Sequence, residues 1–282
     1  MIVVQGQNNV DAMLKMYKAV INSYEMEARG SKCRNVNNLC ILLEAKDPVI
    51  TSFKARKFNL EYAKREWLWY LGADPKDDSI EQYASMWKKL KQEDGSFYSN
   101  YGQYIFAKDG DRPSQFEYCL KMLKDDPQTR RASMVLLKKE HLFPENTDTV
   151  CTYAINFFVE HGHLNMTVMM RSNDVVFGFT NDAFCFWNLY ELMFKLLQAK
   201  VPTLKYGYYT HLANSMHVYD RHYDMLKAIV TDPSGNGGYT RIDVPRPSAQ
   251  DAAAIVKSFG KDLSSEYGKW LSSSAQDVQT GA

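Results

Sequence analysis

Cys151 opens an apolar run of the chain, and Arg171, Ser172 and Asp174 follow directly after another such run. A further carboxylate, Asp182, stands just before a long apolar segment. A thiolate is a nucleophile, a guanidinium anchors phosphate oxygens, and a carboxyl group accepts or shares protons. Reactive groups gather where strands end and helices begin, so we expect these side chains to belong to one site.

Two strands and a helix would position these groups. The runs 151–159 and 164–170 are rich in β-branched and aromatic residues, and the turn residues 160–163 separate them. This pattern predicts a β-hairpin. Residues 183–197 are apolar over a helical length, so we expect a helix that starts beside Asp182.

Local start signals predict further helices. Asn9 is expected to cap a helix that stops by Gly30, because apolar residues recur between them at helical spacing. Asn59 is the expected cap of the next helix. Ser114 and Glu117 have the spacing of a capping box, which predicts another helix start.

The composition limits the class of protein. The 282 residues are 45% hydrophobic and carry a net charge of +1, which leaves little basic excess for coating a nucleic acid. No apolar run reaches the length of a membrane span, and the N-terminus has no signal-peptide pattern. The five cysteines lack metal-site or disulfide spacing, and His217 and His222 lack zinc spacing, so we expect no metal and a reducing cytoplasm.

Cys151 also has an ordinary explanation, because a free cysteine at the start of a buried strand most often only packs. A reactive role would need positive neighbours that lower the pKa of the thiol. Cys40, Cys119 and Cys185 lie inside apolar patterns, and for these three cysteines we expect packing alone.

Glu66 lies in an aromatic-rich helical segment that has two interpretations. Beside Lys64 and Arg65 it is first interpreted as a solvated residue that points outward. If Glu66 pointed inward instead, burial would raise the pKa of its carboxyl group and suit it to proton transfer.

Arg130 and Arg131 precede a predicted strand over residues 132–137. A basic pair in a turn is usually solvated, and adjacent residues of an extended segment point opposite ways. Two such arginines rarely serve one site within one subunit, but a dimer interface could use both. The glycine-rich loop 234–238 lacks the lysine of a phosphate-binding loop, so we treat it as structural.

One long stretch and the order of several shorter pieces resemble a known family. The stretch is Met-Arg-Ser-Asn-Asp-Val-Val-Phe-Gly-Phe at residues 170–179, followed by Asn181-Asp182. The shorter pieces are Arg29, Arg65-Glu66, Trp87, Ser99-Asn100-Tyr101-Gly102, Arg130-Arg131, Cys151 and His217-Val218-Tyr219. Over residues 10–230 the chain resembles the thymidylate synthase family, most closely its phage-type deoxycytidylate (dCMP) hydroxymethylase branch.

The resemblance implies a role for each of these positions. Cys151 resembles the nucleophile that adds to carbon 6 of the pyrimidine, Glu66 the acid/base that works through ordered water, and Tyr101 the aromatic residue beside the nucleophile. The implied phosphate ligands are Arg29, Arg171 and Ser172, joined by Arg130 and Arg131 from the partner subunit. The implied sugar contacts are His217 and Tyr219, and the implied folate contacts are Trp87 and Asp174.

The resemblance also implies a fold and partners. The fold is α/β (α+β), a mixed sandwich whose large sheet packs against its twin in a homodimer. The cosubstrate is 5,10-methylenetetrahydrofolate, and the compartment is the host cytoplasm if the chain is phage-encoded. We expect a catalytic domain over residues 1–245 and a C-terminal extension over residues 246–282, with one or two helices and a small, polar end.

Asp182 bears on the choice of base. By the resemblance, synthases that act on dUMP carry an asparagine there, whose amide donates to uracil oxygen 4 and accepts from the N3–H group. Cytosine reverses this pattern, and a carboxyl group that shares one proton with the ring can accept from the cytosine amino group. Asp182 therefore favours dCMP, unless it only caps the following helix, as Asn181 could also do.

The last step divides the family. Water addition to the exocyclic methylene gives 5-hydroxymethyl-dCMP, whereas hydride transfer gives a methyl group on dCMP or dUMP. Leu90 stands where many synthases have a second tryptophan, and Thr152 where they usually have histidine, so both departures favour the hydroxymethylase branch. A non-catalytic nucleotide-binding relative is a third alternative, against which the presence of Cys151, Glu66 and the arginines argues.

Overall fold

The computed structural model describes most of the chain as two compact units. Arg29, the end of the tail and most of the predicted loop 234–238 lie outside the described residues. The described residues are 1–28, 30–48, 51–143, 145–232, 235 and 238–274. The first unit comprises Met1–Phe58, Asn165–Trp187 and Tyr206–Val244, and the second comprises Asn59–Leu164, Asn188–Lys205 and Pro245–Ala282.

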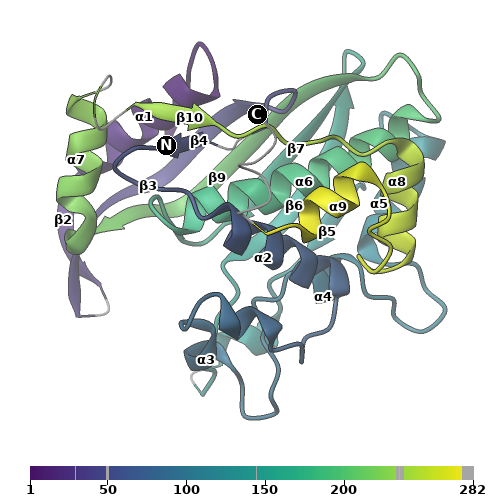
Figure 1. Ribbon diagram of the computed structural model, residues 1–282, viewed down its shortest axis with the longest axis horizontal. Coiled ribbons are helices and arrows are strands. Elements are labelled where there is room, and N and C mark those ends of the chain that lie inside the picture. The colour runs from purple at the N-terminus through teal and green to yellow at the C-terminus, as the bar shows by residue number, and fades with distance from the viewer. Residues whose placement is uncertain (29, 49–50, 144, 233–234, 236–237, 275–282) are drawn as a thin grey trace. The chain divides into compact units, whose positions relative to one another are not determined.

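A mixed β-sheet forms the centre of the first unit. β3 (Ser31–Glu44) pairs antiparallel with β9 (Lys205–Tyr219), and β1 (Ile2–Gln5) pairs with β3 in parallel. Figure 1 shows β3 and β9 running side by side, and the strand order continues from β9 to β7 (His163–Met170). The shorter elements of this unit are β2 (Tyr24–Ala28), β4 (Thr51–Phe53), β8 (Asn173–Asp174), η3 (Asp220–His222), α7 (Tyr223–Thr231) and β10 (Tyr239–Arg241).

α1 (Asn9–Ile21) packs on β3 through an apolar stripe. Val10, Met13 and Tyr17 recur at helical spacing and are all buried. Since burial of such side chains is the main favourable term in folding, this stripe explains why the segment is helical and where it lies.

The predicted bounds of this helix are corrected at both ends. The N-cap is Asn8, not Asn9, because Asn9 is buried and its amide bonds to the backbone of Glu44 instead. The helix ends at Ile21, well before the expected stop at Gly30, because the residues between them form β2 and pair with β3.

Short helices and a two-stranded ladder form the second unit. α2 (Leu60–Gly72) begins at the predicted cap Asn59, whose side chain accepts from Tyr62 N over 3.0 Å. α5 (Gln115–Asp125) begins at the predicted capping box of Ser114. The other elements are η1 (Ser79–Gln82), α3 (Trp87–Leu90), α4 (Gly102–Ile105), β5 (Ser133–Val135), η2 (Lys139–Leu142), β6 (Thr152–Glu160), α8 (Ala249–Lys257) and α9 (Glu266–Ser272).

The strands predicted on either side of residues 160–163 are confirmed as β6 and β7. His161 and Gly162 have positive φ angles of 48° and 78° between these strands. Two-residue hairpin turns of this kind need left-handed backbone at both positions, which glycine adopts without strain.

The helices predicted in the tail are present as α8 and α9, and α9 packs on α2, as Figure 1 shows. Lys64 of α2 is 1% exposed, and its Nζ lies 4.6 Å from the centre of the Trp270 ring. The same ammonium group donates to the backbone and side-chain oxygens of Ser273 over 3.2 and 2.9 Å. A cation–π contact and two hydrogen bonds therefore hold α9 on α2, while the domain division at residue 245 stays a prediction.

α6 (Gly178–Gln198) starts earlier than the sequence predicts. The expected start lay beside Asp182, but the helix begins four residues before it. Asp182 therefore lies inside the helix, and its interpretation as a cap is wrong.

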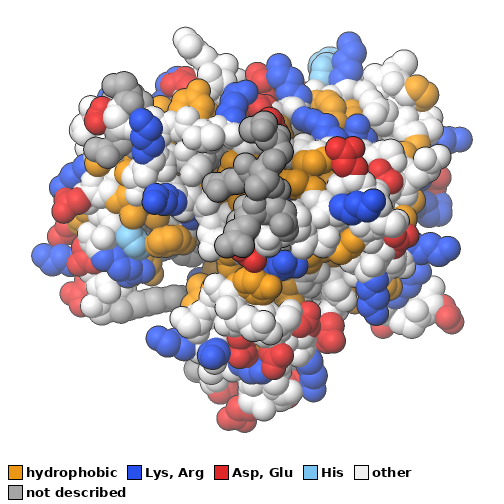
Figure 2. Space-filling model, in the orientation of Figure 1, with side chains coloured by type: hydrophobic (Ala, Val, Ile, Leu, Met, Phe, Trp, Pro, Cys, Tyr) orange, Lys and Arg blue, Asp and Glu red, His pale blue; other side chains and the backbone are white. Residues whose placement is uncertain are grey.

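The face drawn in Figure 2 carries lysine, arginine, aspartate and glutamate side chains interspersed by sign, in keeping with the net charge of +1. Surface charge of this kind gives little long-range attraction for a polyanion. Among the described residues, no helix combines the length and the apolar character that crossing a membrane requires.

Candidate functional site

Asp182 faces a buried polar cluster within the first unit. Asn173 Nδ2 donates to Asp182 Oδ2 over 3.1 Å and to His211 Nε2 over 3.0 Å. His211 Nδ1 lies 2.7 Å from Tyr209 Oη. Asn173, His211 and Tyr209 are buried, whereas Asp182 is half-buried.

Burial shifts the pKa values of the titratable groups in this cluster. It raises the pKa of Asp182 to about 7, against the hydrogen bond from Asn173, which lowers it. Burial lowers the pKa of His211 to about 3 and raises the pKa of Tyr209 well above its usual range. Asp182 can therefore hold or release a proton near neutral pH, while His211 and Tyr209 stay neutral there.

β8 brings the predicted phosphate and folate residues beside a predicted sugar contact. Asp174 pairs with His217 in the parallel register of β8 and β9. Arg171 and Ser172 come directly before β8 and are half-buried. The rings of His217 and Tyr219 meet edge to face, with centroids 5.1 Å apart. The first unit thus gathers these five side chains around the junction of β8 and β9.

Arg56 also belongs to this region, and sequence reasoning missed it. Its Nε donates to Val176 O over 2.8 Å, and its Nη2 donates to Thr180 Oγ1 over 2.9 Å. The guanidinium carbon lies 5.1 Å from the centre of the Phe177 ring, and the residue is 5% exposed. Arg56 therefore clamps the turn between β8 and α6. Its basic neighbours in the sequence resemble a solvated run, so no local signal marked it.

Glu66 points into the second unit and is 5% exposed, so the interpretation as an outward residue is wrong. The physical reason is its helix face, because buried Tyr62 and Tyr70 lie four residues before and after it. Tyr62 Oη donates to Glu66 Oε1 over 2.9 Å, and Trp87 Nε1 donates to Tyr62 Oη over 3.1 Å. Sequence reasoning missed Tyr62, although its spacing from Glu66 was a usable signal.

Aromatic rings surround this hydrogen-bonded chain. Tyr101 stacks on Tyr70 with ring centroids 5.3 Å apart, and the ring centroids of Trp87 and Trp69 are 4.9 Å apart. A Cβ atom on Gly102 would lie 1.6 Å from Tyr70 O, so only glycine allows α4 to approach α2 this closely. α2 thus brings the predicted residues Glu66, Trp87 and Tyr101 into one cluster.

Cys151 differs from Cys119 and Cys185, which were expected to pack, whereas Cys40, the third cysteine of that set, is half-buried like Cys151. It is half-buried immediately before β6, and its Sγ lies 3.8 Å from Thr149 O. Cys119 is fully buried, and burial raises the pKa of its thiol to about 12. Cys185 is also buried. A half-buried cysteine is easier for a substrate to reach than a sealed one.

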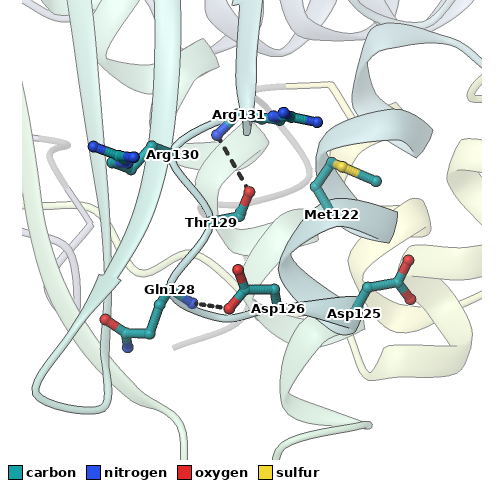
Figure 3. A pocket seen from close by; sticks show the side chains of 7 residues that line it. All are labelled: Met122, Asp125, Asp126, Gln128, Thr129, Arg130 and Arg131. Carbon is teal, nitrogen blue, oxygen red and sulfur yellow. Dashed lines mark hydrogen bonds between the residues drawn. The ribbon is translucent and has the colours of Figure 1, made fainter.

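Arg130 and Arg131 line a surface pocket of about 730 Å³ in the second unit. Figure 3 shows their guanidinium groups pointing in opposite directions. Both side chains are exposed, and neither forms a salt bridge with any other described residue. The lining residues are Met122, Asp125, Asp126, Gln128, Thr129, Arg130 and Arg131.

The predicted site residues are therefore divided between the two units. One group lies in the first unit around Asp182 and Asp174, and another lies in the second unit around Glu66. Cys151 does not line the pocket that holds Arg130 and Arg131. Across the described part of the chain, no three His, Cys, Asp or Glu side chains form a metal-binding group.

Three comparisons relate the chain to known proteins. The thymidylate synthase family model matches residues 13–252. The deoxycytidylate 5-hydroxymethyltransferase of Enterobacteria phage T6 is 33% identical over 177 residues, which cover 60% of this chain and 70% of that protein. The thymidylate synthase of Bacillus atrophaeus is 30% identical over 186 residues, which cover 64% and 78%.

A solved structure shares the fold. The thermostable thymidylate synthase A from Bacillus subtilis superposes with a TM-score of 0.65 and 23% sequence identity, over 78% of this chain and 83% of that one. The mixed α/β fold with a large mixed sheet, implied by the sequence resemblance, is confirmed.

Proposed function

The chain belongs to the thymidylate synthase family, and from this premise we propose that it is a dCMP hydroxymethylase. The family transfers a one-carbon unit from methylenetetrahydrofolate to carbon 5 of a pyrimidine nucleotide. The proposal assigns cytosine as the base and water as the final reactant, which gives 5-hydroxymethyl-dCMP. The observation that carries it is the carboxyl group of Asp182, whose pKa of about 7 suits it to share a proton with cytosine.

Cys151 is the proposed nucleophile. Its sulfur forms a bond to ring carbon 6, and the electron pair of the carbon 5–carbon 6 double bond moves to carbon 5, which becomes nucleophilic. Carbon 5 then bonds to the one-carbon unit supplied by the folate. Departure of the folate with loss of the carbon 5 proton leaves an exocyclic methylene on the ring. Water adds to this methylene and gives the hydroxymethyl group, and departure of the sulfur restores the carbon 5–carbon 6 double bond. The half-buried position of Cys151 supports this role, because a sealed thiol could not meet a substrate.

Glu66 is the proposed acid/base for these proton transfers. Its carboxyl group is 5% exposed and accepts a hydrogen bond from Tyr62, which in turn accepts one from Trp87. A general acid/base must be held within reach of the reacting group or of one bridging water. The chain of hydrogen bonds from Trp87 supports such positioning.

Arginine side chains are the proposed phosphate ligands. Arg171 and Ser172 anchor the nucleotide from their own subunit, and Arg29 is assigned by the family resemblance alone. Arg130 and Arg131 reach the phosphate of the partner site in a homodimer. Both side chains are exposed, and Figure 3 shows them pointing in opposite directions, so they are poorly placed to bind one phosphate within their own subunit. Their exposure instead supports contact with a phosphate bound by the partner subunit.

Asp182 is the proposed reader of the base. Its protonated form can donate to ring nitrogen 3 of cytosine, and its oxygen can accept from the amino group at position 4. Uracil offers an acceptor at position 4 and a donor at position 3, so the carboxylate would face an oxygen lone pair. His217 and Tyr219 are the proposed sugar contacts on the adjoining strand β9.

The folate side is assigned to Trp87 and Asp174. Trp87 lies in a cluster of aromatic rings, which fits a flat heterocycle, and Asp174 holds its loop by accepting from Val176 N over 2.6 Å. When bound, the folate supplies the one-carbon unit at the oxidation level of formaldehyde. These residues bind and orient it but do not react.

A C5-methyltransferase on dCMP or dUMP is the alternative function, favoured by the 30% identity to Bacillus thymidylate synthases. Incubation with dCMP or dUMP and methylenetetrahydrofolate, followed by mass analysis, separates the two. A hydroxymethyl product from dCMP is expected. A methyl product with release of dihydrofolate would overturn the proposal.

Asp182→Asn tests the assignment of the base. The variant should shift the ratio of kcat/KM for dCMP over dUMP by about 100-fold toward dUMP, since two hydrogen bonds change partner. Asp224→Asn, which removes an exposed carboxylate of the same unit, is the matched control and should leave the ratio unchanged. An unchanged ratio in Asp182→Asn would show that Asp182 does not read the base.

A further inference from the structure

A chain of buried polar side chains lies behind Asp182 and has no part in the mechanism above. It runs from Asp182 on α6 through Asn173 on β8 to His211 and Tyr209 on β9. Each consecutive pair is within 3.1 Å, and the last three residues are buried. Buried polar chains are costly unless their members are satisfied, so their presence beside a site residue suggests a role there.

The protonation states along this chain follow from its chemistry. Asn173 Nδ2 can only donate, so His211 Nε2 must accept. His211 is neutral at neutral pH because burial lowers its pKa to about 3, so its single proton is on Nδ1 and is donated to Tyr209 Oη. The donor direction of the chain is therefore determined at every link.

Packing holds the amide of Asn173 in this orientation. Its Nδ2 also lies 2.9 Å from Met170 Sδ, and the ring of Phe179 meets His211 edge-on at 5.1 Å. Its Oδ1 forms no hydrogen bond within the described structure and faces Gly178, where a Cβ atom would lie 2.5 Å from that oxygen. The site thus tolerates an unsatisfied oxygen in order to direct both N–H groups at Asp182 and His211.

The charge environment of the cluster is simple. Burial and the bond from Asn173 have opposite effects on the titration of Asp182. The titratable neighbours in the first unit are His211 and Tyr209 on β9 and Cys185 one turn further along α6. The amide N–H of Asn173 therefore stabilises the ionised form of Asp182 without introducing a charge.

We propose that Asn173, held by His211 and Tyr209, is a positioning residue that occupies Oδ2 of Asp182 and leaves Oδ1 to meet the base. Oδ2 accepts from Asn173 and keeps a second lone pair for the amino group of the base, whereas Oδ1 can exchange a proton with the ring. The statement about the base rests on the proposed function above. The statement about the carboxyl group does not, because it concerns the protein without a ligand.

Three variants of the full chain test the proposal. Asn173→Leu keeps the size of the side chain and removes both donors. His211→Phe keeps a ring and removes the acceptor, whereas His211→Gln places an oxygen acceptor near the position of Nε2. Asn9→Leu is the matched control, because Asn9 is another buried amide of the first unit that bonds only to β3 and the turn after it.

The first measurement is the pKa of the Asp182 carboxyl group in ligand-free protein, followed by NMR of ¹³C-labelled aspartate and assigned with Asp182→Asn. Loss of a donor to a carboxylate should raise this pKa by about one unit in Asn173→Leu. His211→Phe should raise it by less. His211→Gln and Asn9→Leu should match the wild type.

The second measurement is the ratio of kcat/KM for dCMP over dUMP. This ratio should fall about tenfold in Asn173→Leu, the scale of one hydrogen bond to a charged group. It should fall by less in His211→Phe and return in His211→Gln.

Two results would overturn the proposal. One is an Asp182 pKa and a substrate ratio that stay at wild-type values in Asn173→Leu. The other is His211→Gln behaving like His211→Phe, which also decides the matter if Asn173→Leu does not fold. If the wild type converts neither nucleotide, the proposed function fails, and the NMR titration still tests the positioning of Asp182.

Discussion

Two carboxyl groups, one in each unit, accept hydrogen bonds from donors of different origin. Glu66 accepts from Tyr62, which lies one helical turn earlier on the same helix. Asp182 accepts from Asn173, which lies on a strand and is itself held by His211, 38 residues further along the chain. The first pair forms whenever α2 forms and packs, whereas the second exists only after β8, β9 and α6 have assembled.

This difference suggests that Glu66 and Asp182 have different roles in the reaction. A donor on the same helix fixes a carboxyl group with little dependence on the rest of the fold, which suits repeated proton transfer. A donor from a distant strand can be replaced independently of the helix, which suits a change of substrate. Substitutions in the two regions should therefore differ in kind, with losses of rate around Glu66 and changes of preference around Asp182.

The largest effect is expected at Cys151, the proposed nucleophile. Cys151→Ala should lower kcat by at least about 10⁴-fold, because it removes the sulfur that forms the proposed bond to the pyrimidine. Binding of dCMP, measured by calorimetry, should persist because the base and phosphate contacts remain. Wild-type turnover in this variant would mean that the protein is not an enzyme of this mechanism.

The next prediction distinguishes the role of Glu66 from that of Tyr62, its hydrogen-bond donor. Glu66→Gln should lower kcat by about 10²–10³-fold, since the amide cannot transfer the proton. Tyr62→Phe keeps the carboxyl group and removes one hydrogen bond, so its loss of kcat should be about tenfold. Steady-state kinetics with dCMP measure both. Equal losses would show that Glu66 acts only through its contact with Tyr62.

A smaller effect tests whether each site needs two chains. Arg130→Ala and Arg131→Ala should each lower kcat/KM for dCMP by about 10- to 100-fold, the value of a charged phosphate contact. Mixing Arg130→Ala with Cys151→Ala after partial unfolding should restore roughly a quarter of the wild-type activity, because half the dimers are mixed and one of their two sites is intact. No recovery, or a monomer by sedimentation, would contradict a contribution from the partner subunit.

The smallest effect concerns the pH dependence of folding stability, whose sign follows from the raised pKa of Asp182. The pKa of its carboxyl is raised by burial to about 7 in the folded chain, above an unfolded value near 3.8. The folded state therefore binds this proton more tightly, and the stabilisation present below pH 4 is lost as the pH rises through 7. The full change is about 4 kcal/mol or less.

Asp182→Asn should remove this dependence. Urea unfolding from pH 4 to 8 should show the variant gaining stability relative to the wild type as the pH rises, with Asp224→Asn following the wild type. A constant difference between variant and wild type across this range would mean that the pKa of Asp182 is not raised. A pH-dependent stability difference in Asp182→Asn, together with a loss of rate in Glu66→Gln, would show that the two carboxyl groups differ in role.

Local elements of the fold were predictable because their causes are local. Asn59 and Ser114 cap their helices as predicted, since a cap needs only a side-chain oxygen and the next three residues. The strands on either side of His161 and Gly162 follow from apolar runs and a turn that needs left-handed backbone. Asn9 failed as a cap because a strand distant in sequence competes for its amide.

The candidate site was predictable in part. The stretch 170–179 and the order of the shorter motifs identified the family, which the family model confirms over residues 13–252. The outward interpretation of Glu66 was wrong because two neighbouring charged residues, Lys64 and Arg65, outweighed its spacing from buried tyrosines. Arg56 had no signal at all, because its partners Val176 and Thr180 are more than 100 residues away.

The sequence by itself determined which groups can react: one thiol at the start of a strand, a run of phosphate and base ligands, and the helix and turn signals around them. Only the tertiary structure decided which of these groups are buried and which residues they contact. It leaves Cys151 half-buried while sealing Cys119, turns Glu66 inward, and surrounds Asp182 with neutral polar neighbours. The reason is that a side chain's chemistry is local, whereas its solvation and its partners depend on residues that only folding brings together.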